Sequence, residues 1–507
     1  MRIQTLTLFT ILILTALAGC GPSRVPFTQN LREKYQLKPE ELKRIQFYTS
    51  NDLILRRGEN KNTKETEGGE LTLMKDGLVE EIIIKAGTPC LIQEVVDGNK
   101  VTVSFEDGNS RYLVFGSINN LLNKNYEVVD SFDKLPSPAY VCEEELLEKN
   151  LKLLKRVQDE TGVKILLALK GFAMYSTFDL CKKYLKGCCA SGLHEALLAK
   201  EEFGGEVHTY SAAFKDDEID EIISLSNHLV FNSFNQLKRY KDKAFKKVSL
   251  GVRLNPEYSS VEVDLYNPCA PNSRLGITKA NFDESQLEFL DGFHFHALCE
   301  QNVDALEGAL AAFEKNFSQY FDKLKWVNFG GGHHITRADY DVEGLINLLK
   351  DFKARYPHLE VYMEPGEAVG WQTGYLVATV LDIVNNGMDL AILDTSAEAH
   401  MPDTLAMPYR AMIRNSAVAF EKKYTYRLGG NTCLAGDIIG DYSFDEPLKV
   451  GDKIILEDMI HYTMVKTTTF NGIKLPSIII KNKDNYYKVI KNFCYNDYRS
   501  EERRVGK

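Results

Sequence analysis

Four groups of residues that could take part in catalysis each follow or end a short apolar run. They are Lys170 after residues 165–169, His296 in "GFHFHA", the glycines 330–332 in "WVNFGGG", and Glu364 in "EVYMEPG". A lysine amine that burial keeps partly uncharged is nucleophilic and forms Schiff bases with carbonyl compounds. Consecutive glycines let backbone N–H groups approach an anion such as a phosphate. Taken singly, each group also has an ordinary structural explanation: a solvent-seeking lysine, a turn, a core histidine or a rim carboxylate.

The segments around these groups predict eight short strands, most of them separated by amphipathic helices. Helical spacing of apolar residues is clear in "TFDLCKKYL", "GLHEALLAKEEF" and "YDVEGLINLLKDFKARY". Eight strand–helix units over this length predict a TIM (β/α)8 barrel within residues 135–370. The predicted strands are residues 165–170, 187–191, 206–211, 228–233, 247–255, 292–297, 326–332 and 360–366.

A TIM barrel brings the carboxyl ends of its strands together at one mouth, where active sites lie. We therefore expect the four groups to share that mouth. Phosphate sites in such barrels use the loops after strands seven and eight, and a Schiff-base lysine beside a phosphate site indicates pyridoxal 5'-phosphate. Glu364 would then keep the pyridine nitrogen protonated, so that the ring accepts electrons from a substrate carbanion. His296 could stack on the ring.

A dense series of motifs continues to the end of the chain. Among them are "LALKGF", "CASGLHEA", "NPCAPNSRLGI", "GFHFHALCEQN", "NFGGGHHIT", "MEPGEAVGWQTGYLV", "LDTSAEAHMPDTLAMPYR", "LGGNTCLAGDIIGDY" and "HYTMVKTTTFNG". With them, residues 135–498 resemble the fold-type III pyridoxal-phosphate decarboxylases, the alanine-racemase-like class, and within it the branch that acts on carboxynorspermidine and carboxyspermidine. The resemblance implies an α/β fold: the barrel is followed by a β-rich C-terminal domain at residues 371–498. It also implies a polyamine as the product.

The same resemblance implies roles for individual residues. Lys170 resembles the Schiff-base lysine, and His296 resembles the ring-stacking histidine. The resemblance places the phosphate at Gly331, Gly332 and Tyr462, and the pyridine nitrogen at Glu364. Cys433, in "NTC", is similar to the cysteine that the partner subunit contributes to return a proton to Cα after CO2 leaves. A homodimer with shared active sites is therefore expected.

Two departures from the wider class bear on the substrate. Cys188 stands where ornithine decarboxylase relatives have an aspartate, and Glu367 stands where they have the arginine of "E-P-G-R". A glutamate at this place suits a substrate with a distal amine. Other acidic residues of the C-terminal motifs could bind a polyamine chain through charge-assisted hydrogen bonds, although a diffuse acidic surface is the plain alternative. These are Asp394, Glu398, Asp403 and Asp437. Diaminopimelate, ornithine and arginine remain alternative substrates.

The N-terminus has a different character. Residues 1–20 combine Arg2, an apolar stretch and "LAGC", which resembles a lipoprotein signal with Cys20 as the lipidated residue; an N-terminal hydrophobic helix is the plain alternative. Residues 21–134 form a small β-rich module and a junction, with hairpin turns expected at Asp76-Gly77, Asp97-Gly98 and Asp107-Gly108. The module supports a rival hypothesis, in which the protein is a membrane-anchored envelope lipoprotein with a binding role.

The composition sets limits on partners and compartment. The formal net charge is −10 and basic residues form no long block, which argues against nucleic acid as a partner. The ten cysteines include no pair of C-x-x-C units, so we expect no structural zinc site. A decarboxylase belongs in the cytoplasm, whereas a lipoprotein signal directs a chain outward. We interpret this conflict, with the unrelated tail at residues 499–507, as a fused or chimeric reading frame.

Overall fold

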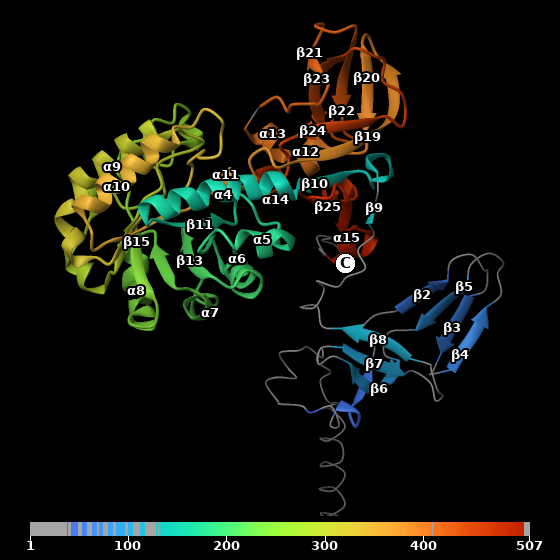
Figure 1. Ribbon diagram of the computed structural model, residues 1–507, viewed down its shortest axis with the longest axis horizontal. Helices are drawn as coiled ribbons and strands as arrows, with labels where there is room; N and C mark the ends of the chain where they lie inside the picture. The colour runs from blue at the N-terminus through green and yellow to red at the C-terminus, as the bar shows by residue number, and fades with distance from the viewer. Residues whose placement is uncertain are drawn as a thin grey trace, which may run out of the picture. The chain divides into compact units, whose positions relative to one another are not determined.

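The computed structural model divides into two compact units, Met1–Asn125 and Tyr126–Lys507 (Figure 1). Because residues 1–20 lie outside the described residues, the structure does not address the predicted lipidation of Cys20. Within the described residues, no helix is long and apolar enough to cross a lipid bilayer. The structure describes residues 38, 42–48, 53–57, 63–67, 70–74, 80–84, 88–96, 100–104, 112–116, 128–129, 131–407 and 409–500.

The described part of the first unit contains two four-stranded sheets. Antiparallel pairs β6–β7 and β7–β8 confirm the hairpins expected around Asp97-Gly98 and Asp107-Gly108. The hairpin expected at Asp76-Gly77 is wrong, because β5 pairs with β2 and, in parallel, with β3 instead of with β4. The sheets are, in spatial order, β1 (Gln46–Tyr48), β6 (Pro89–Val96), β7 (Lys100–Ser104) and β8 (Tyr112–Gly116), and β2 (Leu53–Arg57), β5 (Glu80–Ile84), β3 (Thr63–Glu67) and β4 (Glu70–Met74).

The second unit contains a closed parallel barrel, so the predicted TIM barrel is confirmed with all eight strands in the expected order. Most of these strands end a few residues earlier than the sequence predicts. The residues that could take part in catalysis therefore lie in the loops that follow; Lys170, for example, lies two residues beyond the end of β11. The strands are β11 (Lys164–Ala168), β12 (Gly187–Ala190), β13 (Glu206–Ser211), β14 (His228–Phe231), β15 (Ser249–Arg253), β16 (Gly292–His294), β17 (Trp326–Asn328) and β18 (Glu360–Met363).

Amphipathic helices surround this barrel (Figure 1). Helix α4 buries Leu147, Leu151 and Leu154 on one face and ends at Gly162, whose φ of 69° suits the left-handed position after a helix. The helices of the barrel region are α4 (Glu144–Thr161), α5 (Phe178–Cys181), α6 (Leu193–Leu198), α7 (Ile219–Leu225), α8 (Phe234–Ala244), α9 (Val303–Phe317), α10 (Val342–Arg355) and α11 (Glu367–Gly370). Short helical turns are η2 (Phe132–Lys134), η3 (Tyr175–Thr177), η4 (Ala199–Phe203), η5 (Asp264–Tyr266), η6 (Lys279–Asn281), η7 (Glu284–Phe289) and η8 (Ser318–Lys323).

A mixed sheet forms the rest of the second unit, in agreement with the predicted β-rich C-terminal domain. In spatial order its strands are β21 (Ala417–Val418), β23 (Ile438–Phe444), β22 (Tyr424–Gly429), β20 (Asp389–Leu393), β19 (Gly374–Asn385), β10 (Ala139–Glu143), β25 (Ser477–Lys481), β26 (Tyr487–Lys491) and β9 (Val128–Val129), with β24 (Lys453–Glu457) beside β19. The helical pieces here are α12 (Ala397–His400), α13 (Pro402–Ala406), α14 (Tyr462–Val465), η9 (Phe470–Gly472) and α15 (Tyr495–Ser500).

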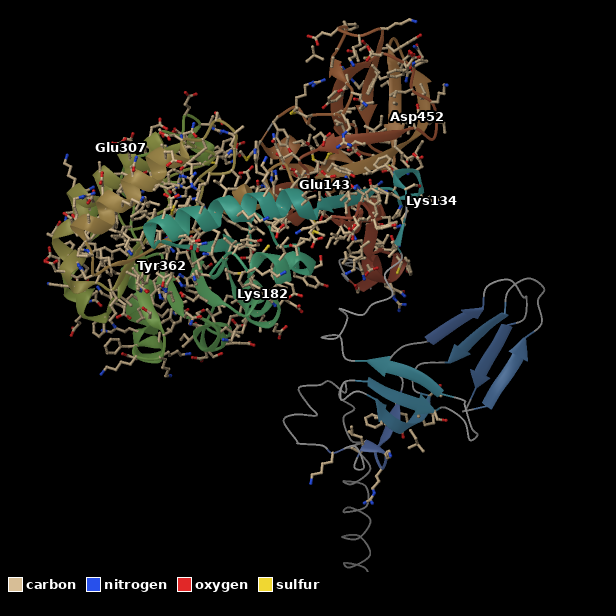
Figure 2. The ribbon with its side chains drawn as sticks, in the orientation of Figure 1. Lys134, Glu143, Lys182, Glu307, Tyr362 and Asp452 are labelled. Carbon is tan, nitrogen blue, oxygen red and sulfur yellow. The ribbon has the colours of Figure 1, made fainter. Side chains whose placement is uncertain are left out.

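Two strands that precede the barrel in sequence belong to this sheet. Strand β10 lies between β19, antiparallel, and β25, parallel; β9 pairs with β26. Figure 2 shows Glu143, the last residue of β10, where the sheet meets helix α4. The structure therefore gives residues 139–143 to the sheet, although the sequence assigned them to the barrel domain. The pairing partners lie more than 200 residues away, so local patterns could not show it.

The barrel interior contains one large aromatic side chain packed against glycines. Trp326 is buried with Leu166, Val230 and Tyr362, and its ring stacks on His228 with centroids 4.5 Å apart. A Cβ atom at Gly292 would lie 2.0 Å from Trp326 Cδ2, and one at Gly251 would lie 2.4 Å from Cη2. Glycines at 251 on β15 and 292 on β16 therefore make room for the indole.

We expect Gly292→Ala to destabilise the protein by about 1–3 kcal/mol, because the methyl group overpacks the barrel against Trp326. Urea unfolding measures this loss. Gly436→Ala is the matched control, since a Cβ there meets nothing within 4 Å. Equal stability of the two variants would contradict the packing described here.

Candidate active site

The mouth of the barrel brings the four predicted groups together. The backbone N–H of Gly331 donates to His296 Nδ1 over 2.9 Å, and the N–H of Glu364 donates to the carbonyl of Gly330 over 2.8 Å. The charge of Lys170 interacts with both Glu364 and His296. The loops after β11, β16, β17 and β18 therefore meet as the sequence predicted.

Glu364 is a buried carboxylate, 7% exposed, with two side-chain neighbours on adjacent strands. Asn328 Nδ2 donates to Oε1 over 2.7 Å, and His294 Nε2 lies 3.3 Å from Oε2. Burial alone would raise the pKa of Glu364, but these neighbours outweigh it and hold the pKa below its ordinary value. Burial also lowers the pKa of His294, so the neutral ring donates through Nε2–H. Glu364 is therefore ionised and suited to a protonated ring nitrogen.

His296 is held in one tautomer. Because Nδ1 accepts the Gly331 N–H, the proton of the neutral ring is on Nε2. Burial, reinforced by the charge of Lys170, lowers the pKa of His296 well below its ordinary value. A Cβ at Gly331 would lie 3.3 Å from His296 Cε1 and 2.4 Å from the Glu364 carbonyl oxygen, so this loop position requires glycine.

Lys170 lies exposed within the mouth, but the protein around it still disfavours its charge. Desolvation, with the charge of Arg253, lowers its pKa and favours the neutral, nucleophilic amine. Arg253 is itself buried; it donates to the carbonyl of His296 over 3.1 Å and packs on Tyr210 with 4.8 Å to the ring centroid. It is a cation at the mouth that the sequence analysis missed.

His294 and Asn328 were missed as well. In "FHFHA" two histidines stand two residues apart, a spacing that places both on the same side of an extended strand. This alternation could have pointed to His294. Asn328 precedes the glycine loop in "WVNFGGG" without any local pattern that marks it. Its carbonyl Oδ1 also accepts the Gly330 N–H over 2.9 Å, so one amide orders both the carboxylate and the loop.

The other predicted cofactor and catalytic residues lie on the C-terminal domain. Tyr462 begins α14, and its electrostatic neighbours are Glu367, Cys299 and Glu300. Burial raises the pKa of Tyr462, so its phenol stays protonated as a hydrogen-bond donor. Cys433 is exposed on the loop between β22 and β23, a position that leaves its thiol accessible to another molecule.

The predicted substrate-binding acids differ in what they contact. Asp394 accepts the N–H of Thr379 over 2.7 Å. Asp437 uses both oxygens, accepting from Ala397 N at 2.7 Å and Thr432 Oγ1 at 2.6 Å. These contacts indicate that Asp394 and Asp437 order their own domain.

Glu398 and Asp403 are better placed for a ligand. Glu398 is half-buried on α12. Asp403 is 5% exposed and accepts from Tyr409 and Thr463 through Oδ2, while its buried Oδ1 has no partner among the described residues. A buried oxygen of this kind can accept a hydrogen bond from an incoming cation.

Two groups of residue types that can ligate metals also occur among the described residues: Glu206, His208 and His228, and Glu300, His334 and Glu367. In the first group Lys164 Nζ lies 3.0 Å from Glu206. In the second group Arg337 lies 3.4 Å from His334 Nδ1. Each of these two groups therefore already has a basic side chain beside one of its members.

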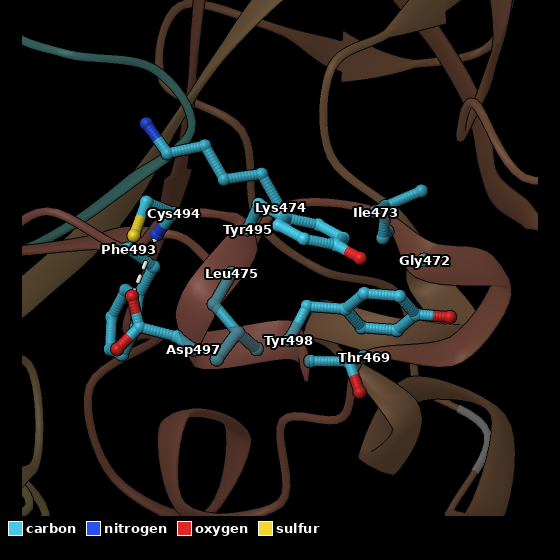
Figure 3. Close-up of a pocket in the computed structure, with 10 residues that line it drawn as sticks. All are labelled: Thr469, Gly472, Ile473, Lys474, Leu475, Phe493, Cys494, Tyr495, Asp497 and Tyr498. Atoms are coloured by element: carbon cyan, nitrogen blue, oxygen red, sulfur yellow. Dashed lines mark hydrogen bonds between the residues drawn. The ribbon is translucent and has the colours of Figure 1, made fainter. Parts of the chain in front are cut away.

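A separate cavity of about 270 Å³ lies in the C-terminal domain (Figure 3). Thr469 and Gly472 line one side, and Tyr495 and Tyr498 of α15 line another. It contains none of the predicted site residues, so we place the candidate active site at the barrel mouth.

Comparison with known proteins agrees with this arrangement. The family model described as "Pyridoxal-dependent decarboxylase, C-terminal sheet domain" matches residues 114–460. The chain belongs to the pyridoxal-dependent decarboxylases. A carboxynorspermidine/carboxyspermidine decarboxylase of Campylobacter jejuni is 51% identical over 378 residues, which cover 72% of this chain and 98% of the relative. A carboxyaminopropylagmatine decarboxylase of Synechocystis is 46% identical over 368 residues, 72% of this chain and 95% of the relative.

A solved structure shows the same relationship. The crystal structure of carboxynorspermidine decarboxylase from Campylobacter jejuni, complexed with norspermidine, is 50% identical with a TM-score of 0.68 and covers 72% of this decarboxylase and 100% of that chain. Diaminopimelate decarboxylase from Helicobacter pylori shares the fold at 19% identity, with a TM-score of 0.62 and coverage of 73% and 98%.

The barrel mouth of this decarboxylase fits pyridoxal 5'-phosphate. An ionised, buried Glu364 needs a cationic neighbour, which a protonated pyridine nitrogen provides. Lys170 can hold the aldehyde end, and the glycine loop can receive the phosphate. Bound there, the cofactor supplies an electron-accepting ring for loss of the substrate carboxylate.

We expect Asn328→Ala to raise the pKa of Glu364, because the variant loses a hydrogen bond to the carboxylate. Such a bond contributes about 1.5–3 kcal/mol, which corresponds to roughly one to two pH units. The ionised form of Glu364 is lost as pH falls through its pKa, so a higher pKa moves the acid limb of the pH–activity profile to higher pH. Asn385→Ala, which removes an exposed amide donor to Asp389, is the control. Coincident acid limbs for wild type and Asn328→Ala would refute the role of this amide.

Proposed function

We propose that this decarboxylase converts carboxynorspermidine or carboxyspermidine to norspermidine or spermidine with release of CO2. The observation that carries the proposal is the relative of that activity, of which 98% is covered at 51% identity. The norspermidine complex of a chain 50% identical to this one supports a polyamine ligand. The diaminopimelate decarboxylases that match nearly full length are at most 23% identical and support the fold alone.

The mechanism follows from what the side chains of this chain can hold or transfer. Lys170, whose amine is favoured in its neutral form, would hold the aldehyde end of the cofactor. Glu364 would keep a proton on the pyridine nitrogen, and His296 would pack on the ring. Gly331, Gly332 and Tyr462 would hold the phosphate. Cys433 of the partner subunit would supply the proton that replaces the lost carboxylate.

The substrate chain carries ammonium groups, and acids of the C-terminal domain suit them. Asp403, with its unpartnered buried Oδ1, is the strongest candidate, followed by Glu398. The sequence also suggested Asp394 and Asp437, whose carboxylates order their own domain, and Glu367, which begins α11 beside the barrel. The Synechocystis relative makes carboxyaminopropylagmatine a second candidate substrate. Comparing CO2 release from the candidate substrates, with diaminopimelate, ornithine and arginine included, distinguishes these functions.

The decarboxylase would act in the cytoplasm as a homodimer with shared sites. Membrane attachment through Cys20 applies only if the lipoprotein-like segment is translated with the rest. The second unit contains its own sheets from β9 onward, which supports an origin of the first unit as a separate module. Mass spectrometry of peptides spanning residues 110–140 tests whether one continuous chain exists.

We expect Lys170→Ala to abolish the absorbance of lysine-bound pyridoxal phosphate and to lower turnover by at least about 10³-fold, as loss of a covalent nucleophile does. Absorbance spectroscopy and CO2 release measure these effects. Lys164→Ala, at the opposite end of β11, is the control. An unchanged absorbance band with full turnover would exclude Lys170 as the cofactor lysine.

Mixing two inactive variants tests the shared site. If Cys433 acts on the partner's cofactor, random subunit exchange between Lys170→Ala and Cys433→Ala gives hybrid dimers with one intact site. We therefore expect recovery of roughly a quarter of wild-type activity. No recovery, despite dimers that exchange subunits, would mean that Lys170 and Cys433 serve the same chain's site.

A further inference from the structure

Three loops around the barrel mouth are connected by alternating acids and imidazoles. Glu367 Oε2 lies 3.1 Å from His334 Nε2, and Glu367 Oε1 lies 3.7 Å from His461 Nδ1. His461 Nε2 lies 3.2 Å from Asp458 Oδ1. We call Asp458, His461, Glu367 and His334 the acid–imidazole chain. It runs from the loop after β17, through α11, to the segment before α14.

Most of this chain lies inside the protein. The exposed fractions of its side chains are 3% for His334, 8% for His461, 13% for Glu367 and 21% for Asp458. Trp371 packs on both imidazoles, with ring centroids 4.7 Å from His334 and 6.2 Å from His461. Asp458 also accepts the backbone N–H of Gln372 over 2.6 Å. Burial and packing fix the geometry, unlike that of an exposed ion pair.

The two imidazoles of the chain adjoin, in sequence, residues proposed to hold the phosphate. His334 follows Gly332 by two residues, and His461 immediately precedes Tyr462. TIM barrels bind phosphates at the loops after strands seven and eight, which here carry Gly332 and Glu367. Thr336 Oγ1 donates to the carbonyl of Ala368 over 2.6 Å and ties these same loops together.

The contacts of Glu367 argue against a direct role in binding substrate. Each of its oxygens already faces an imidazole. A carboxylate without such partners would repel a nearby phosphate. A carboxylate between two imidazoles instead fixes the positions of His334 and His461. Glu300 offers a comparison, since an oxygen of this exposed residue lies within 4.8 Å of the facing atoms of Glu367 and His334.

We propose that the acid–imidazole chain positions Gly332 and Tyr462 for the phosphate group of pyridoxal phosphate, and that Glu367 is a positioning residue for the cofactor instead of a ligand of the substrate. This inference rests on the proposed phosphate-binding roles of Gly332 and Tyr462. It does not depend on which amino acid the enzyme decarboxylates.

The test is titration of the cofactor-free enzyme with pyridoxal phosphate and with pyridoxal, which lacks the phosphate. In Glu367→Gln and His461→Asn we expect the Kd of pyridoxal phosphate to rise about 10- to 100-fold, because each change removes a buried acid–imidazole contact that fixes these loops. The Kd of pyridoxal should stay within about twofold. Glu300→Gln is the matched control: it removes a nearby negative charge from outside the chain and should not weaken either ligand.

Three results would overturn the inference. One is a Glu367→Gln variant that binds pyridoxal phosphate as tightly as wild type or more tightly, which simple charge repulsion predicts. Another is an equal loss of affinity for both ligands in both variants. The third is an unchanged cofactor Kd with a raised substrate KM, which would return Glu367 to the substrate. Because the titration needs no substrate, a wild type inactive on carboxynorspermidine would refute the proposed function and leave this test valid.

Discussion

An ionised carboxylate in the middle of a parallel barrel must receive hydrogen bonds from the strands beside it, since water cannot supply them. Glu364 meets this constraint through His294 on β16 and Asn328 on β17. The parallel register places these two donors directly opposite each other. A shift of either strand by one residue would turn its donor to the other face. The alignment of the barrel and the protonation of the cofactor ring therefore depend on the same contacts.

The imidazoles at the mouth are neutral for a related reason. Burial disfavours positive charge at the mouth, where Arg253 already carries one, so the pKa values of His294 and His296 fall. Neutral rings with fixed tautomers can pack on a flat cofactor and donate in one direction. The same surroundings lower the pKa of Lys170. One electrostatic environment thus prepares both the nucleophile and the groups that orient the ring.

Much of the site could be predicted from the sequence because, in a TIM barrel, residues that follow a strand lie at the mouth where the active site forms. Each apolar run ends at the mouth, so chain order alone places Lys170, His296, the glycine loop and Glu364 together. Donors inside a strand, such as Asn328, depend on cross-strand register and have no local pattern. The acids show the same limit. The carboxylates of Asp394 and Asp437 could bind a cation, but in the fold they accept backbone N–H groups and, at Asp437, the Thr432 hydroxyl. Similarly, the parallel pairing of β3 with β5 cannot be read from alternating residues.

The position of β10 also has a consequence for how the chain is made. Its last residue, Glu143, is joined by an ion pair to Lys481, 338 residues later. At about 5–20 residues per second, a ribosome needs roughly 20–70 s to complete that span. Throughout this time the strand lacks its β25 neighbour, while the whole barrel emerges between them. Until β25 is synthesised, one edge of the apolar strand β10 is unpaired and can pair with other chains. The time at which β25 emerges therefore sets how long β10 is exposed to aggregation.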